Sequence, residues 1–410
     1  MNPFKLAPLS DDFARALARA TGRKIETRSL PALVERVSRK YLGEQQSLAK
    51  PDELAARALF FLPRDLHKVV APIAELSRAG LVPRRPLRVL DVGAGVGASA
   101  LGALMALSAL GHSVARVRCV DDDREALSTL RKVFDALRSD SLIDLAPSAL
   151  SVGEGSVDAA NNLGDPSEAG SPWDLILVSN VLTEVLRRED ARSDEKRDEQ
   201  ARAERVAELL RSLIAGAPLA EDGALLLIEP ATHEDARVLQ RARTLLEEGP
   251  APRFVFAPCT HGQPCPLLTR ERDWCHDDVD VDLPAWLHEV ARGAGLRYQG
   301  LTYSYLTVRS KPGRLQKHSA NEGWVSARMV SAVRDTKGKR EAFLCCQEKG
   351  DAVEPREPLR AMQLDRAIKR ADEATPKLAD CSRGELVAIA PALLPDEGRT
   401  VRLGADDWER

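Results

Sequence analysis

The stretch Val89-Leu90-Asp91-Val92-Gly93-Ala94-Gly95-Val96-Gly97 decides the fold of this chain of 410 residues. In it an apolar run ends in an acid, and three alternate glycines follow. The apolar run is typical of a buried parallel strand, and residues 98–110 (ASALGALMALSAL) are typical of a buried helix. Because glycines let the backbone turn sharply and approach a ligand closely, the stretch predicts a strand, a ligand-binding loop and a helix.

Two classes of cofactor compete for this loop. Gly93, Gly95 and Ala98 satisfy the G-x-G-x-x-G/A pattern of dinucleotide sites. Asp91, however, lies two residues before the first glycine, where a nicotinamide site usually has an apolar residue. The order D-x-G-x-G-x-G resembles motif I of class I S-adenosylmethionine methyltransferases. That resemblance implies a Rossmann-like α/β fold in which the turn holds the methionine part of the cofactor.

Further polar residues follow the next expected strands. Residues 114–120 (VARVRCV) predict a second strand, and Asp121 follows it at the position that binds ribose hydroxyls in such folds. Residues 173–179 (WDLILVS) predict another buried strand, after which Asn180 is expected at the same edge of the sheet. The Asn/Asp-Pro-Pro-aromatic motif of many amino-group methyltransferases is absent here, so no catalytic residue is named. The expected cofactor site comprises Asp91, Gly93, Ala94, Gly95, Gly97, Asp121, Asp122 and Asn180.

Composition limits the classes of protein that the chain can belong to. The formal net charge of -3 gives no global indication of nucleic-acid binding. No apolar run approaches the roughly 20 residues that span a bilayer, and the first residues lack a signal-peptide core. We therefore expect a cytoplasmic protein without membrane contact. In that compartment the seven cysteines are expected to be metal ligands or buried thiols rather than disulfides.

The chain divides into five expected parts. Apolar residues at helical spacing predict an N-terminal helical region, and alternating strands and helices predict the cofactor-binding core. A cysteine-rich insertion is expected in place of the usual final hairpin, followed by strands that complete the sheet. A helix is expected at 359–371 in the C-terminal extension. The expected boundaries are 1–84, 85–250, 251–296, 297–350 and 351–410.

Three cysteines of the insertion have a spacing that favours a metal site. Cys259, Cys265 and Cys275 form C-x5-C-x9-C in a loop rich in proline and glycine. Clustered thiolates repel one another unless a cation neutralises them, so a fourth ligand is expected. The candidates are the adjacent Cys345 and Cys346, with His261 and His276 as rivals. The spacing matches neither zinc ribbons nor ferredoxins, and a structural zinc remains an alternative.

The insertion also carries a family resemblance. The order P-C-x-H-x-x-x-C-P at 258–266, W-C-H at 274–276 and a distal Leu-Cys at 344–346 resembles the Rsm-type methyltransferase-like proteins of the small ribosomal subunit. Mitochondrial members of that family assist small-subunit assembly. The resemblance covers residues 55–350 and implies a [4Fe-4S] cluster. Its implied ligands are Cys259, Cys265, Cys275 and a distal cysteine, placed at Cys346 by its spacing to Gly350.

Local charge suggests where RNA would bind. Between Arg309 and Arg340 there are nine Lys or Arg and two acids, and residues 1–50 hold ten Lys or Arg and five acids. The first of these segments is the leading RNA contact, and the N-terminal helices are the second. Together with the resemblance, this predicts an S-adenosylmethionine-dependent methyltransferase acting on small-subunit rRNA or an assembly precursor. The alternative is a non-enzymatic assembly factor that keeps the pocket and the metal cluster for structure or sensing.

Overall fold

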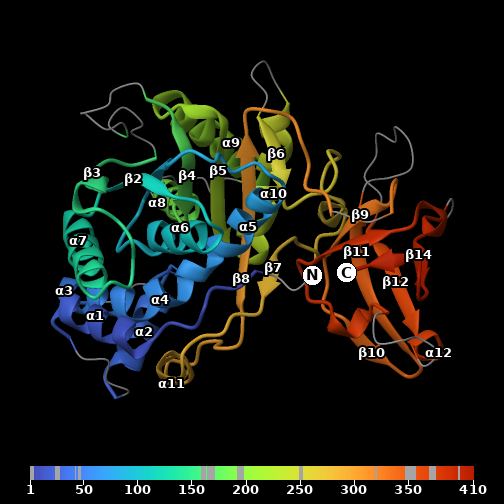
Figure 1. Cartoon of the computed structure of the whole chain (residues 1–410), viewed down its shortest axis with the longest axis horizontal. Coiled ribbons are helices and arrows are strands. Elements are labelled where there is room, and N and C mark those ends of the chain that lie inside the picture. Colours follow the sequence, from blue (N-terminus) through green and yellow to red (C-terminus); the bar gives the residue numbers. More distant parts are fainter. Residues whose placement is uncertain are drawn as a thin grey trace.

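Two β-sheets organise the chain (Figure 1). The computed structural model describes residues 4–23, 28–41, 43–44, 48–157, 163, 171–191, 198–248, 253–317, 319, 321–346, 357–368, 375–395 and 398–410. The larger sheet has eight strands in the order β3-β2-β1-β4-β5-β8-β6, and β7 also pairs with β8. Its strands are β1 (Leu87–Val92), β2 (Val114–Asp121), β3 (Leu150–Glu154), β4 (Trp173–Ser179), β5 (Leu219–Pro230), β6 (Phe254–Ala257), β7 (Asp277–Val279) and β8 (Leu301–Arg309).

The larger sheet is buried on both faces, as its apolar strands predict. Strands β1 to β5 are parallel, whereas β8 runs antiparallel between β5 and β6. Successive residues of β1 enter different cores: Val89 packs with the N-terminal helices and Leu90 with the opposite layer. The helices that follow the strands are α6 (Ala98–Ala109), α7 (Arg124–Ser139), α8 (Leu182–Asp190), α9 (Glu199–Gly216) and α10 (His233–Glu247).

The final hairpin of this sheet is present, which corrects the expectation that the insertion replaces it. Strands β6 and β8 pair antiparallel, and the insertion lies between them together with β7 and α11 (Ala285–Gly293). The four residues of β6 gain their hydrogen bonds from a distant strand. The local sequence pattern cannot predict this pairing, because the pairing depends on which edge strand of the sheet still has unpaired backbone groups.

Helices precede the first strand and cover one side of the sheet. They pack in the same apolar core as α6 and α7, and the chain turns through a five-residue π-helical segment, η1. π-helical segments are rare in proteins, and those that occur often lie at functional sites. The elements are α1 (Asp11–Thr21), α2 (Leu30–Tyr41), α3 (Lys50–Ala56), η1 (Arg57–Phe61), α4 (Leu62–Asp65), η2 (Leu66–Val69) and α5 (Val70–Arg78).

The second sheet has seven strands and its own apolar core (Figure 1). The expectation that the strands after residue 324 complete the first sheet is wrong, because they pair with C-terminal strands. The expected helix at 359–371 is also wrong over 359–364: side chains of β12 alternate between buried and half-buried, which is the period of a strand. The elements are β9 (Val325–Met329), β10 (Arg334–Thr336), β11 (Lys339–Cys346), β12 (Leu359–Leu364), α12 (Asp365–Ile368), β13 (Leu386–Ile389), β14 (Thr400–Leu403) and β15 (Trp408–Glu409).

The expected boundary between residues 350 and 351 falls inside the second sheet, because β11 pairs with β12 across it. Strands β9 to β15 therefore belong to one sheet, whereas β8 belongs to the larger sheet. Residues 369–371 of the expected helix and Gly350 lie outside the described residues. None of the helices in the described ranges has the length and apolar character that a membrane span requires.

Candidate cofactor pocket and cysteine cluster

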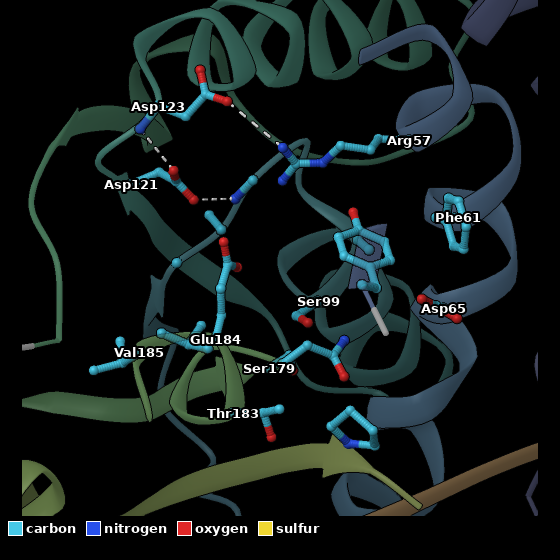
Figure 2. A pocket seen from close by; sticks show the side chains of 18 of the residues that line it. Arg57, Phe61, Asp65, Ser99, Asp121, Asp123, Ser179, Thr183, Glu184 and Val185 are labelled. Atoms are coloured by element: carbon cyan, nitrogen blue, oxygen red, sulfur yellow. Dashed lines mark hydrogen bonds and ion pairs between the residues drawn. The ribbon is translucent and has the colours of Figure 1, made fainter. Parts of the chain in front are cut away.

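A pocket of about 1020 Å³ lies at the carboxyl ends of the parallel strands (Figure 2). In open α/β sheets this edge is where ligands bind. The glycine loop after β1, the acids after β2 and the polar residue after β4 meet there. Of the expected cofactor residues, the pocket is lined by Gly93, Ala94, Gly95, Asp121, Asp122 and Asn180.

Asp121 is fixed by the glycine loop. Its Oδ2 accepts a hydrogen bond from the backbone N–H of Gly95 at 2.7 Å, and its Oδ1 accepts one from the N–H of Asp123 at 2.8 Å. Burial raises the pKa of the Asp121 carboxyl. These two hydrogen bonds and the nearby Arg57 lower the same pKa, but the effect of burial is larger, so the pKa lies above its usual value. The carboxylate is therefore held in one orientation at the pocket wall, where it can accept further hydrogen bonds from hydroxyl groups.

Asp91 and Gly97 lie behind the pocket rather than in its lining. Asp91 is 1 % exposed, and its Oδ2 accepts the N–H of Ala100 at 2.9 Å in the first turn of α6. Burial raises the pKa of Asp91 to about 7. Gly97 has a φ of +96°, and a Cβ there would meet Leu130 at 2.9 Å. The two residues shape the loop and the start of the helix, so their expected role in cofactor binding is indirect.

The turn after β4 has an unusual backbone. Asn180 lines the pocket with a φ of +58°, a conformation that non-glycine residues seldom adopt. A Cβ on Gly93 would clash with Cγ2 of Val181, so this valine covers the loop. Beneath the turn, buried Glu229 accepts hydrogen bonds from the N–H groups of Leu182 and Thr183 at the start of α8. These contacts hold the turn after β4 in place at the edge of the pocket.

The fourth wall of the pocket comes from the N-terminal helices, which sequence reasoning did not include in the site. Figure 2 shows Arg57, Phe61 and Asp65 on this wall. Arg57 reaches across the loop: its Nη1 lies 3.6 Å from Oδ2 of Asp123, and a Cβ on Gly95 would lie 2.5 Å from its Nη2. No sequence motif marks these residues, because only the folding of η1 and α4 against the loop brings them there.

The predicted cysteines gather at the boundary between the two sheets. Cys259, Cys265 and Cys275 are all buried, and the nearby Cys265 together with burial raises the pKa of the Cys275 thiol. The side chain of Cys345 packs in one small cluster with Cys265 and Cys275, and its Sγ lies 3.0 Å from Nε2 of His261. Cys346 instead packs against the core of the second sheet. Because neighbouring residues of a strand face opposite sides, Cys345, and not the expected Cys346, packs with cysteines of the insertion.

A buried arginine faces these thiols. Arg243 is 0 % exposed and donates hydrogen bonds to the carbonyl oxygens of Gln263 at 2.7 Å and His261 at 2.6 Å. Burial lowers the pKa of Arg243, but the nearby Cys259, Cys265 and Cys345 raise it, with a net rise. Burial, with two nearby arginines, lowers the pKa of His261 to about 3. Over the described ranges, no three His, Cys, Asp or Glu side chains are arranged as a metal site.

The basic segment from Arg309 to Arg340 does not form one continuous surface, because some of its cations are buried. Arg309 is 5 % and Arg328 4 % exposed. Arg328 lies between Asp277 Oδ2 at 2.5 Å and Glu75 Oε1 at 3.1 Å, and Arg314 pairs with Glu247. Arg309 and Arg328 are therefore held inside the protein, and Arg314 is half-buried beside Glu247. The exposed cations of the segment, among the described residues, are Lys311, Arg334 and Lys337.

The strand order, the glycine loop and the acid after β2 define an α/β protein of the class I methyltransferase fold. The chain belongs to the Rsm22 family: the model of that family, described as "mitochondrial small ribosomal subunit Rsm22", matches residues 55–354. No curated protein matches the chain.

Several solved structures resemble parts of the chain at low identity. A candidate RNA methyltransferase from Pyrococcus horikoshii is 14% identical over 68% of this chain and 95% of its own, with a TM-score of 0.30. TrmN from Thermus thermophilus is 18% identical over 58% of this chain and 47% of its own, with a TM-score of 0.29. An S-adenosylmethionine-dependent methyltransferase from Mesorhizobium loti is 17% identical over 38% and 52%, with a TM-score of 0.22. The fold assignment depends on the strand order and not on these weak likenesses.

Proposed function

We propose that this protein binds S-adenosylmethionine in the pocket and acts as a methyltransferase on small-subunit rRNA or a precursor of the small ribosomal subunit. The observation that carries the proposal is the meeting of Gly93, Gly95, Asp121 and Asn180 around one pocket. Family membership supports the ribosomal context. In this proposal Asp121 accepts the ribose hydroxyls, and the glycine loop lets the cofactor approach the backbone.

Catalysis would consist mainly of positioning. When bound, the cofactor supplies a methyl group on an already activated sulfonium. The protein's part is to hold the acceptor atom in line with that methyl group and to exclude water. Asn180 follows β4 and lines the pocket, and its strained backbone sets the direction of the turn toward the pocket. No side chain is assigned as a base.

A non-enzymatic assembly factor is the second candidate. It is favoured by the sequence Asn180-Val181-Leu182, which lacks the Asn/Asp-Pro-Pro-aromatic motif of many amino-group methyltransferases and in which the side chain of Val181 covers Gly93. In that case the pocket would serve folding or sensing. The family description names mitochondria, so the expected cytoplasmic location stays a prediction that cell fractionation would test.

Comparing rRNA modification by mass spectrometry separates the two candidates. The strains to compare are wild type, a deletion strain and an Asp121→Asn strain, because Asp121 lies in the pocket lining whereas Asp91 does not. A modification lost in both altered strains supports the enzyme. Unchanged modification together with defective subunit assembly supports the assembly factor.

We further propose that Cys259, Cys265, Cys275 and Cys345 hold the [4Fe-4S] cluster, with zinc as the alternative. The donors suit either metal: Cys265, Cys275 and Cys345 pack in one small cluster, and the Arg243 cation lies near Cys259, Cys265 and Cys345. Protein purified without oxygen should be brown and contain iron with acid-labile sulfide. Colourless protein with one zinc per chain would reject the cluster and retain the ligands.

RNA contact is proposed for the exposed tip of the β10–β11 hairpin, with the N-terminal helices as the second surface. Changing Arg334→Glu together with Lys337→Glu should weaken binding to small-subunit rRNA and flatten its dependence on salt, because fewer counterions are then released. Lys311→Glu is the matched control, since Lys311 is exposed but pairs with Glu221. An unchanged affinity and salt slope in the double variant would direct attention to the N-terminal helices.

A further inference from the structure

The N-terminal wall of the pocket carries a compact group of opposite charges that the cofactor residues named so far do not explain. Arg64 and Lys68 both contact Oδ1 of Asp65: Arg64 Nη1 lies at 3.1 Å and Lys68 Nζ at 3.3 Å. All three residues line the pocket. Their side chains are only 18%, 16% and 11% exposed, in chain order. Charged groups kept out of solvent in a pocket wall are costly, and such groups concentrate at functional sites.

The group is not saturated by its own contacts. Nε of Arg64 is buried and has no hydrogen-bond partner in the described part of the chain. Among the described residues, both cations contact the same oxygen of Asp65, and no hydrogen bond reaches its Oδ2. Two cations and one anion therefore line one wall of the pocket, and Oδ2 of Asp65 has no hydrogen-bond donor among the described residues. This arrangement is complementary to a ligand that carries a carboxylate and an ammonium on adjacent atoms.

The position of the group suits the far end of a nucleoside ligand. In Figure 2, Asp65 lies on the opposite side of the pocket from Asp121, with Ser99 between them. Ser99 lies in the first turn of α6 and also lines the pocket. A ligand whose ribose contacts Asp121 would thus direct its other end past the glycine loop toward the charged group.

We infer that Arg64, Asp65 and Lys68 form the recognition site for the zwitterionic amino-acid end of the nucleoside cofactor, an inference that rests on the proposed function. The ligand carboxylate is bound by Lys68 and Arg64, and the ligand ammonium is bound by Asp65. The same group explains the choice of cofactor. A nicotinamide dinucleotide has a pyrophosphate and no ammonium, so Asp65 would repel it and its own charge would remain unmatched.

Calorimetry with two ligands tests this assignment. S-adenosylhomocysteine carries the amino-acid end, whereas 5′-methylthioadenosine has the same nucleoside and thioether but lacks it. Lys68→Met and Asp65→Asn should each weaken binding of S-adenosylhomocysteine by about 10- to 100-fold, the usual effect of losing a charge-assisted hydrogen bond. Both variants should bind 5′-methylthioadenosine within about twofold of wild type, which also shows that the pocket is intact. Lys68→Arg should recover most of the lost affinity.

Two control variants complete the design. Asp121→Asn should weaken both ligands, because it acts at the ribose end, and Lys311→Met, an exposed lysine outside the pocket, should change neither. If wild type binds both ligands but Lys68→Met and Asp65→Asn weaken them equally or not at all, the amino-acid site is wrong and the proposed function stands. If wild type binds neither ligand, the proposed function is wrong, and this inference, which rests on it, is wrong as well.

Discussion

Gly95 combines a backbone conformation that favours glycine with a place in the wall of the proposed cofactor pocket. Its φ of +53° favours glycine, its N–H is bound to Asp121, and a Cβ there would lie 2.5 Å from Nη2 of Arg57. Gly95→Ala should therefore weaken binding of S-adenosylhomocysteine by at least about 10-fold, because the added methyl narrows the approach to the loop. Calorimetry measures the affinity, and urea unfolding measures the stability.

Gly111→Ala is the matched control for this substitution. Gly111 has a φ of +81°, and no atom lies within 4 Å of the position that a Cβ would take, so it shares the backbone strain without the close approach. Both variants should lose about 1 kcal/mol of unfolding free energy. Only Gly95→Ala should lose affinity. Equal affinities in the two variants would mean that the loop does not approach the ligand.

Asp91 should make the stability of the protein depend on pH. Burial raises its pKa to about 7, from about 4 in an unfolded chain. Between these two values the folded state binds more protons than the unfolded state. The contribution of Asp91 to the free energy of unfolding therefore falls as pH rises from about 4 to about 7 and does not change above that. The neutral carboxyl, not the carboxylate, is the form that stabilises the fold.

Asp91→Asn should remove this contribution, because the amide stays neutral and its oxygen can still accept the N–H of Ala100. Urea unfolding at pH 5 and pH 8 measures the difference between the two conditions. That difference should be smaller in the variant than in wild type by roughly 2 kcal/mol. Glu229, whose pKa burial also raises to about 7, keeps part of the pH dependence in both proteins. An unaltered difference would show that Asp91 is ionised in the folded state.

At the scale of a single element, β11 decides which of two adjacent cysteines joins the thiol cluster. Cys345 faces Cys259 and His261, and Cys346 faces the core of the second sheet. Cys345→Ser should therefore lower the metal content of anaerobically purified protein as much as Cys259→Ser does. Cys346→Ser should leave the metal content near that of wild type. The reverse result would mean that β11 is shifted by one residue relative to its partners.

The π-helical segment η1 is a second element with local consequences. Its wide turn ends where α4 begins, with Pro63 in the first turn of that helix, where a missing N–H is tolerated. Arg57 and Phe61 lie at the two ends of η1 and both reach the pocket. The helical periodicity of this region was visible in the sequence, but the extra residue in the turn, which sets these directions, was not.

At the scale of the whole molecule, Arg328 connects the two sheets. It lies in β9 of the second sheet and contacts Asp277 of β7 at 2.5 Å, Glu75 of α5 at 3.1 Å and the hydroxyl oxygen of Tyr305 in β8 at 2.9 Å. Arg328→Met should lower the free energy of unfolding by about 3–5 kcal/mol, because it leaves two acids buried without their cation. Urea unfolding measures this change.

The control for this variant is Arg138→Met. Arg138 pairs with Asp135 on the surface of α7, and such exposed pairs contribute at most about 1 kcal/mol. A loss of similar size in the two variants would contradict the role of Arg328 as a buried connection. A second, separate unfolding transition that appears only in Arg328→Met would indicate that the sheets have become uncoupled.

The sequence by itself determined the parts of this protein that depend on neighbouring residues. The apolar run of β1, the glycines after it and the acid after β2 predicted a Rossmann-like sheet with a pocket at the carboxyl ends of its strands, because a strand, a tight turn and a carboxylate each leave a local pattern. The order of cysteines and the distal Leu-Cys predicted the family, which the match over 55–354 confirms.

Only the tertiary structure decided what depends on distant segments meeting. The pairing of β6 with β8, the union of β11 and β12 in a second sheet and the packing of Cys345 beside Cys265 and Cys275 all depend on strand register. The burial of Arg328 and the charged wall at Arg64 and Lys68 likewise arise from packing between segments that are far apart in the chain. The physical reason is that burial and pairing are properties of three-dimensional neighbours, and a charge looks the same in the sequence whether it faces solvent, an internal acid or a ligand.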